Sequence, residues 1–246
     1  MPPRYAILRE ADCRLNLTRA AEILAPLHSL ARAEMLQALH LRPGVLAWNL
    51  TEATCGEAVQ ALAAAGMPCR TIQEDELVAI PAAPRTSLRS ADFHDDHLVF
   101  RSVEWEGQVP WEKIRLLDIV QEMKGETELV PNPYQTAPAT TYAKPRMVRR
   151  ARFDVRVFLE IICADPVLRM RVDRSQFGYN TTGLKMHSSR ELNFRALCIA
   201  LHMRSPAALA GPGFSWIAKG NNSHHPSGNT RAKFENFATW LLTVEQ

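Results

Sequence analysis

The residues best suited to metal chemistry lie in one short run, Asp92 to His97, with the sequence DFHDDH. It places two imidazoles and three carboxylates within six residues, and both groups are common ligands of divalent metals. A metal held by His94, Asp96 and His97 could activate a water molecule for hydrolysis. The alternative interpretation is a solvated loop that precedes a strand.

The HDDH part of this run resembles the second half of the His-x-His-x-Asp-His motif of metallo-β-lactamase-like hydrolases. Asp92 stands where that motif has its first histidine, and the repeated βα units of that fold have no clear counterpart here. His224 and His225 lie in a polar run, but adjacent histidines point apart in an extended chain and are poorly placed to bind one metal. We therefore predict no metal site and no cofactor, and keep a metal-dependent hydrolase as an alternative.

A second group of residues, all arginines, could bind anions. Three of them follow Lys144 and Arg146 in a basic run. The other two alternate in a predicted strand at 168–172, so these two share one face of the strand, which we expect to point outward. Arginine forks fit phosphates and carboxylates. The predicted ligand- or partner-binding residues are Arg149, Arg150, Arg152, Arg169 and Arg171.

The net charge of +3 is distributed unevenly along the chain. Residues 1–90 carry 9 basic and 9 acidic residues, residues 91–143 carry 4 and 10, and residues 144–246 carry 16 and 7. The basic segment could offer a face to nucleic acid or to an acidic protein surface. Alternatively, this face is solvated, or the acidic segment 91–143 neutralises it. Only Tyr142 and Phe153 flank the basic run, so few aromatic rings are available for base stacking.

Other catalytic motifs are absent from the sequence. It contains no Gly-x-Ser-x-Gly nucleophile motif, no phosphate-binding loop and no Gly-x-Gly-x-x-Gly fingerprint. The five cysteines are scattered without a Cys-x-x-Cys pair, which predicts reduced, mostly buried thiols. No signal peptide or membrane span is recognisable, so we expect a cytoplasmic protein. Because these catalytic motifs are missing, we also expect that it is not an enzyme.

The elements of the first 73 residues are predicted from local signals. YAILRE and GVLAWNL read as strands, and two helices are expected between them, a short one at 18–25 and a longer one from near Pro26. Thr51 can cap a third helix, which Gly66 ends before a last strand in CRTI. The order is β-α-α-β-α-β.

The runs LTRAAEIL and RPGVLAWNLTEATCGEAVQALAAAGMPCRTI resemble the C-terminal domain of the stalk protein of the bacterial large ribosomal subunit. The resemblance lies in the helix order and in the Ala-rich last helix that closes on Gly66, and it covers residues 5–73. That family binds translation factors through a lysine-rich helical face, whereas the first lysine here is Lys113. The resemblance therefore implies the fold but not factor binding.

The remainder of the chain is predicted to be richer in strands. One hairpin is expected around Glu106-Gly107, an irregular loop over 127–147, and a second hairpin from the strict alternation of 155–163 with 168–172. A helix that begins with the capping pattern Ser188-x-x-Glu191 and a last amphipathic helix follow. The apolar face of the last helix comprises Phe234, Phe237, Ala238, Leu241 and Leu242.

These elements predict an α+β or α/β protein with two small domains. The expected division is an N-terminal β-α-α-β-α-β sandwich at 1–82, a linker at 83–94, and a domain at 95–246 in which antiparallel strands form a partial barrel or sheet with capping helices. The strands, the PWEKI step and the helix over 95–205 resemble the pleckstrin-homology-like barrel. Because the hairpin turn that binds phosphoinositides in some members is acidic here, we expect no membrane partner.

Three hypotheses for function follow. The first is a non-catalytic cytoplasmic module that binds protein, either a partner or a second copy of itself, through the arginine-bearing hairpin and its adjoining loop. The second is binding of nucleic acid or of a phosphorylated ligand through the same arginines. The third is a metal-dependent hydrolase that uses the 92–97 cluster.

Overall fold

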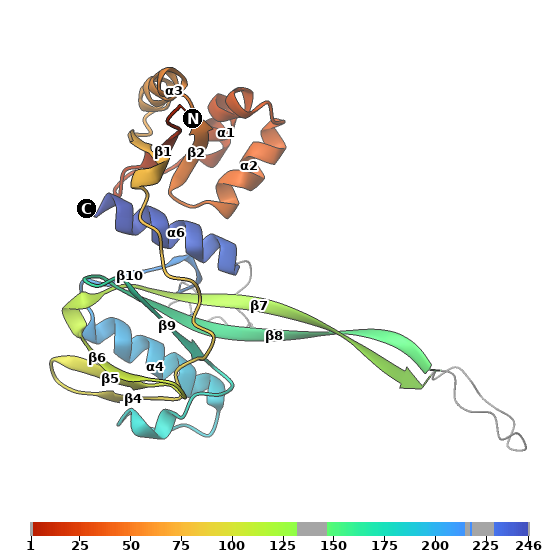
Figure 1. Cartoon of the computed structure of the whole chain (residues 1–246), viewed down its shortest axis with the longest axis vertical. Helices are drawn as coiled ribbons and strands as arrows, with labels where there is room; N and C mark the ends of the chain where they lie inside the picture. Colours follow the sequence, from red (N-terminus) through yellow and green to blue (C-terminus); the bar gives the residue numbers. More distant parts are fainter. Residues whose placement is uncertain (1, 132–146, 215–216, 218–228, 246) are drawn as a thin grey trace, which may run out of the picture.

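The protein has an α+β fold, seen in a computed structural model that describes residues 2–131, 147–214, 217 and 229–245. Two groups of elements, one from each half of the chain, lie on opposite sides of the C-terminal helix α6 (Arg231–Val244) (Figure 1). No helix in the described ranges combines the length and the apolar character needed to cross a bilayer.

The N-terminal domain contains a three-stranded sheet and three helices. In chain order these are β1 (Tyr5–Arg9), α1 (Leu17–Leu24), α2 (Arg32–Leu41), β2 (Val45–Leu50), α3 (Glu52–Ala64) and β3 (Cys69–Gln73). Strand β1 is central and antiparallel to both neighbours. Ile7 packs among the three helices, whereas the next residue, Leu8, packs on the opposite face against α6, because successive strand residues point to opposite faces.

The predicted order of these elements is confirmed, and so are two of its local signals. The Thr51 hydroxyl accepts a hydrogen bond from the Thr54 N–H at 3.3 Å, and Gly66 adopts a φ of 76° just past the end of α3. The predicted start of the second helix near Pro26 is wrong. Pro26 lies in a 3-10 turn (Ala25–His28) followed by Ser29 with a φ of 53°, and α2 begins only at Arg32.

The C-terminal domain contains two sheets. Strands β4 (Ser90–Phe93), β5 (His97–Arg101) and β6 (Glu106–Pro110) form one, and β7 (Ile114–Pro131), β8 (Met147–Cys163), β9 (Leu168–Asp173) and β10 (Leu209–Ala210) form the other, in the order β10-β7-β8-β9. Helix α4 (Arg190–Arg204) contributes Phe194 and Leu201 to the core that both sheets share. Strand β4 lies within the segment predicted as linker, and Leu88 just before it bridges to Val172 of β9.

Details of this domain differ from the prediction. The turn of the first hairpin comprises residues 102–105, and Glu106-Gly107 belongs to β6. The cap of α4 is Ser189, which makes no side-chain capping bond, while Glu191 pairs with Arg174. The hairpin of β8 and β9 is confirmed.

Helix α6 joins the two domains. Leu8 and Val45 of the N-terminal sheet lie on one side of it, and Leu116, Val120 and Ile162 of the C-terminal sheet belong to the same core. Trp240 is buried in addition to the predicted apolar residues, so the helix buries more than one face. The last helix is therefore shared between the domains.

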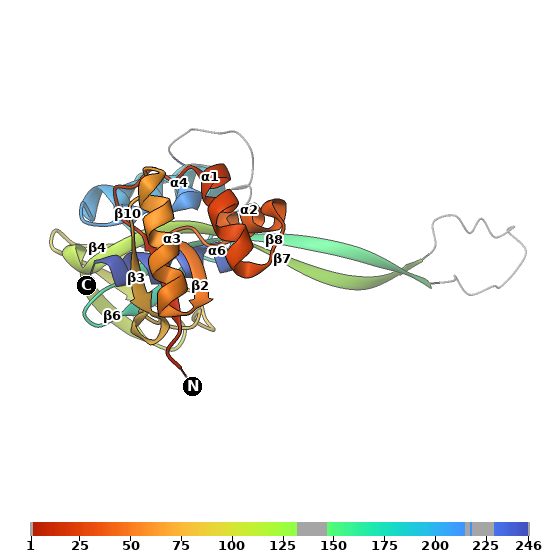
Figure 2. The same ribbon diagram turned by 90° about the horizontal axis from the view of Figure 1, so that it is seen from above.

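Strands β7 and β8 continue far beyond the rest of their sheet as a two-stranded ribbon (Figures 1 and 2). Backbone pairing runs from Ile114 opposite Cys163 to Pro131 opposite Met147. The irregular loop predicted from residue 127 is therefore wrong at its start, because residues 127–131 belong to β7. We call residues 122–131 and 147–156 the arm.

Candidate interaction site

The arginines predicted from the sequence fall in two different environments. Arg149, Arg150 and Arg152 lie in β8 on the arm, and the register places Arg150 opposite Glu128 and Arg152 opposite Glu126. Arg149 is opposite Leu129. Lys144 and Arg146, like His224 and His225, lie outside the described residues.

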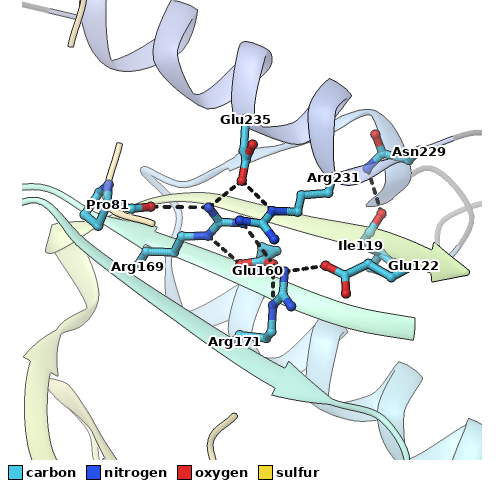
Figure 3. A network of polar contacts seen from close by, with 9 residues as sticks. All are labelled: Pro81, Ile119, Glu122, Glu160, Arg169, Arg171, Asn229, Arg231 and Glu235. Atoms are coloured by element: carbon cyan, nitrogen blue, oxygen red, sulfur yellow. Dashed lines mark hydrogen bonds and ion pairs between the residues drawn. The ribbon is translucent and has the colours of Figure 1, made fainter. Parts of the chain in front are cut away.

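Arg169 and Arg171 share one face of β9, as predicted, but the prediction that this face points outward is wrong. The two residues are 3% and 7% exposed. Helix α6 lies over this face, and Arg169 also contacts the Pro81 carbonyl (Figure 3). Pro81 belongs to the segment 77–89 between the two domains, which we call the linker from here on. Alternation identifies which residues share a face, whereas the identity of the solvent-facing side depends on elements distant in sequence.

Both arginines converge on Glu160 of β8, whose side chain is fully buried (Figure 3). Arg169 donates to both oxygens of Glu160, from Nε at 2.9 Å and from Nη2 at 3.2 Å. Arg171 donates to Glu160 from Nε at 2.6 Å and to Glu122 from Nη2 at 2.9 Å. A buried carboxylate that engages two guanidinium forks in this way keeps its charge compensated.

The network continues into α6 and the linker. Arg169 Nη1 donates to Glu235 at 3.0 Å and to the Pro81 carbonyl at 3.3 Å, and Arg231 donates to Glu235 at 2.8 Å. Burial acts to raise the pKa of Glu235, but hydrogen bonds from Arg231 and Arg169 outweigh it and lower that pKa. Three arginines and three glutamates thus hold the sheet, α6 and the linker together, and their charges balance.

Sequence reasoning missed Glu160 as the centre of this network. The sequence pattern that indicates a buried carboxylate here is a single glutamate inside the apolar run VFLEIIC. A carboxylate placed among buried strand residues needs a cationic partner, and Arg169 and Arg171 lie on the next strand. Their role in the fold is to neutralise Glu160.

The 92–97 cluster does not assemble into a metal site. Asp92 forms an ion pair with Arg101 at 2.5 Å, and Asp96 contacts His97 at 2.6 Å, which lowers the pKa of Asp96. The rings of His94 and His97 stack with centroids 4.5 Å apart. Within the part of the chain that the structure describes, no group of three or more His, Cys, Asp or Glu side chains could hold a metal ion.

Two aromatic side chains attach the loop before α4 to the core. Phe177 and Tyr179 are 2% and 6% exposed, and the Tyr179 hydroxyl donates to the Arg174 carbonyl at 2.9 Å. The predicted burial of most thiols is confirmed, because four of the five cysteines are buried and Cys69 is partly buried.

The arm was not predicted from the sequence, which indicated an irregular loop over 127–147. Beyond Gln121 on β7 and before Phe158 on β8, no third strand pairs with either edge in the described ranges, since β9 pairs from Phe158 onward and β10 pairs only with Leu116 and Leu117. Met123, at the root of the arm, is 74% exposed. Both edges of the arm are therefore unpaired among the residues that the structure describes.

Comparison with known protein families, with curated proteins and with solved structures finds no match to this chain. The resemblances to the ribosomal stalk domain and to the pleckstrin-homology-like barrel therefore stay predictions.

Proposed function

We propose that the protein is a non-catalytic interaction module that binds another protein through the arm. The observation that carries the proposal is the unpaired state of both arm edges in the described part of the chain. A two-stranded ribbon is only marginally stable in water, and its free backbone N–H and C=O groups can pair with an added strand. A strand from a partner protein would satisfy one edge by β-augmentation.

The charge of the arm favours protein over nucleic acid as the partner. Strand positions of opposite charge face each other in the register, including Glu122 opposite Arg156 and Lys124 opposite Asp154. The arm carries five basic and four acidic residues, namely Lys124, Arg149, Arg150, Arg152 and Arg156 against Glu122, Glu126, Glu128 and Asp154. A ribbon that binds nucleic acid would need a clear excess of positive charge to displace counterions.

Nucleic acid is the second candidate partner. Lys144 and Arg146 directly precede the arginines of β8 in the sequence and add positive charge to that part of the chain. The partner in the leading proposal is a protein with an exposed strand, which includes a second copy of this chain. A cytoplasmic location belongs to the same proposal.

The arm can be shortened without touching the buried network. Met123 and Val155 are opposite each other in the register, so an Asn-Gly turn placed between them would replace residues 124–154 and close the ribbon at its root. Glu122 and Glu160 would stay in place. We expect this variant to fold, to keep the free energy of unfolding of its two domains unchanged, and to lose binding to its partner.

Two measurements test this expectation. Sedimentation velocity of the full chain and of the shortened variant reports self-association, and capture from native lysate with both proteins as bait reports other partners. A stoichiometric partner, or a dimer, that is retained by the full chain and lost from the variant supports the proposal. A monomer that captures the same proteins with and without the arm would overturn it.

The second candidate is separated from the first by salt dependence. If the arm binds nucleic acid, retention on RNA or DNA should fall steeply as salt rises and should weaken when Arg149 and Arg150 become Ala. The matched control replaces Arg19 and Arg32, which pair with Glu22 on the N-terminal domain. Equal retention of both double variants would exclude the arm as the nucleic-acid site.

A further inference from the structure

A pocket of about 400 Å³ lies at the root of the arm, between the linker and the β7, β8 and β9 strands. The linker contributes one wall through residues 84–89, and the turn after β9 contributes Gln176. The volume lies in the range of pockets that hold small molecules. Four arginines line it, and they come from the linker, β8 and β9, which are distant in sequence: Arg85, Arg89, Arg156 and Arg171.

The carboxylates of this pocket are already engaged. Glu122 accepts from Arg171 at 2.9 Å, and Asp173 accepts from the backbone N–H and the hydroxyl of Ser175 at 2.8 and 2.6 Å. Arg171 in turn is neutralised by Glu160. Glu122 and Arg171 belong to the charge-balanced network, whereas Asp173 keeps one negative charge because its Ser175 donors are neutral. The positive charge of the pocket comes from its three other arginines and exceeds that single negative charge.

Those remaining arginines have little compensation. The Arg156 Nε lies 3.5 Å from the Asp154 Oδ2, and the two side chains are 41% and 58% exposed, so solvent weakens this pair. Among the described residues, no ion pair or side-chain hydrogen bond involves Arg85 or Arg89, and both are exposed. Arginines gathered around one hollow repel each other unless an anion lies between them.

The lining also offers neutral hydrogen-bond donors. Thr86 and Ser87 supply hydroxyl groups beside Arg85, and Gln176 supplies an amide. Such donors combine with arginine forks to surround the oxygens of a phosphate, each fork donating two parallel hydrogen bonds. The mostly polar character of the other side chains disfavours a large apolar ligand.

We propose that this pocket binds the phosphate of a small phosphorylated ligand that carries more than one negative charge. Arg85, Arg89 and Arg156 hold the phosphate oxygens, and the ligand links the linker to the root of the arm. The site lies at the root of the arm and does not require a strand to pair with the arm edges, so it can be correct even if the arm has no protein partner.

Titration calorimetry with pyrophosphate at constant ionic strength tests the proposal on the full chain. We expect saturable binding that weakens at least about tenfold in the Arg85→Ala, Arg89→Ala double variant, because each lost fork removes charge-assisted hydrogen bonds. The control is the Arg19→Ala, Arg32→Ala double variant, which removes the same charge from the N-terminal domain and should bind as the full chain does. All four substitutions are at exposed positions, and melting temperatures check that each variant folds.

The source of the phosphate is decided by a second arm of the experiment. Co-sedimentation with phosphatidylcholine vesicles, with and without phosphatidic acid, reports binding to a lipid headgroup. Binding that needs phosphatidic acid and is lost in the Arg85, Arg89 variant assigns the phosphate to a lipid, and pyrophosphate binding without co-sedimentation assigns it to a soluble ligand. Absence of saturable binding to both probes, or equal binding by the two double variants, overturns the proposal.

Discussion

Trp240 of the C-terminal helix packs directly against the backbone of Gly44, at the turn before β2. A β-carbon at Gly44 would lie 2.2 Å from Cγ of the indole, and Gly44 has a φ of 96°. The indole N–H donates to the Arg9 carbonyl at 2.8 Å, and the Arg9 guanidinium stacks 4.5 Å from the ring centroid. This contact fixes α6 to the N-terminal sheet and gives a direct test of the domain junction.

Replacing Gly44 by Ala should lower the free energy of unfolding by about 2–5 kcal/mol. Overpacking against Trp240 contributes roughly 1–3 kcal/mol, and a β-carbon in the left-handed region adds about 1–2 kcal/mol. Urea unfolding followed by circular dichroism measures the change. Gly56→Ala is the matched control. Gly56 is an exposed position of α3 where a β-carbon meets nothing within 4 Å, so alanine there should stabilise the protein by about 0.5–1 kcal/mol. Equal effects at both glycines would contradict the packing of Trp240.

Glu160→Gln should be among the most destabilising single changes in the protein. It leaves Arg169 and Arg171 buried around a neutral amide, and loss of one partner from a buried ion network costs about 3–5 kcal/mol. The free energy of unfolding in urea measures this. Exposed Glu57→Gln, the matched control, should change it by less than about 0.5 kcal/mol.

A triple variant distinguishes charge compensation from simple packing. Replacing Glu160, Arg169 and Arg171 together by Met, Met and Leu removes every buried charge at the centre of the network. We expect it to be less destabilised than Glu160→Gln, because well-packed apolar groups can substitute for a buried ion cluster. A triple variant with a larger loss than the single variant would show that the hydrogen-bond geometry, and not the buried charge, dominates.

The N-terminal domain was predictable because its signals are local. Thr51 caps helix α3, and Gly66 follows its end in a left-handed conformation. Each of these depends on residues within one or two turns of the chain. The start of α2 was missed because Ser29 adopts a left-handed conformation that glycine would have signalled but serine does not.

The candidate site was predictable only in part. Sequence alternation placed Arg169 and Arg171 on one face of a strand, but Glu235 of α6 lies 66 residues from Arg169, and nothing local indicates that contact. The arm carried a signal that a search for complementary charges would have found. Glu126 and Glu128 recur at a two-residue spacing, as do Arg150 and Arg152, and the four meet in the register.

The N-terminal domain should depend on α6 for part of its stability. Leu8 is fully buried and Val45 is 6% exposed in the core that contains α6, so a fragment of residues 1–85 would expose both. Each such side chain is worth roughly 1.5–3 kcal/mol of burial. We expect the fragment to unfold at lower urea than the domain does within the full chain, and a synthetic peptide of residues 229–245 to raise its midpoint. A fragment whose midpoint does not respond to the peptide would contradict the shared core.

Asp118 should make stability depend on pH in an unusual direction. It is fully buried in β7, and burial raises its pKa from 3.8 to about 7, although Asn229 Nδ2 and the N–H groups of Ile119 and Gly213 donate to it at 2.8–2.9 Å and favour the ionised form. Because the folded pKa lies above the unfolded value, the folded protein binds this proton more tightly. The contribution of Asp118 to the free energy of unfolding is therefore fully present below about pH 4 and is lost as pH rises to about 7.

The size and the sign of this effect can both be measured against Asp118→Asn, which cannot titrate. The free energy of unfolding of the unmodified protein minus that of the variant should fall by about 1.4 kcal/mol per pH unit, for a total of roughly 4 kcal/mol across the window. It should become flat above about pH 7. Groups that titrate equally in both proteins cancel in the difference, so urea unfolding at several pH values between about 5 and 8 isolates Asp118. A difference that rises with pH would mean that the three donors outweigh burial and that the carboxylate is ionised in the folded protein, because only a lowered pKa gives that slope.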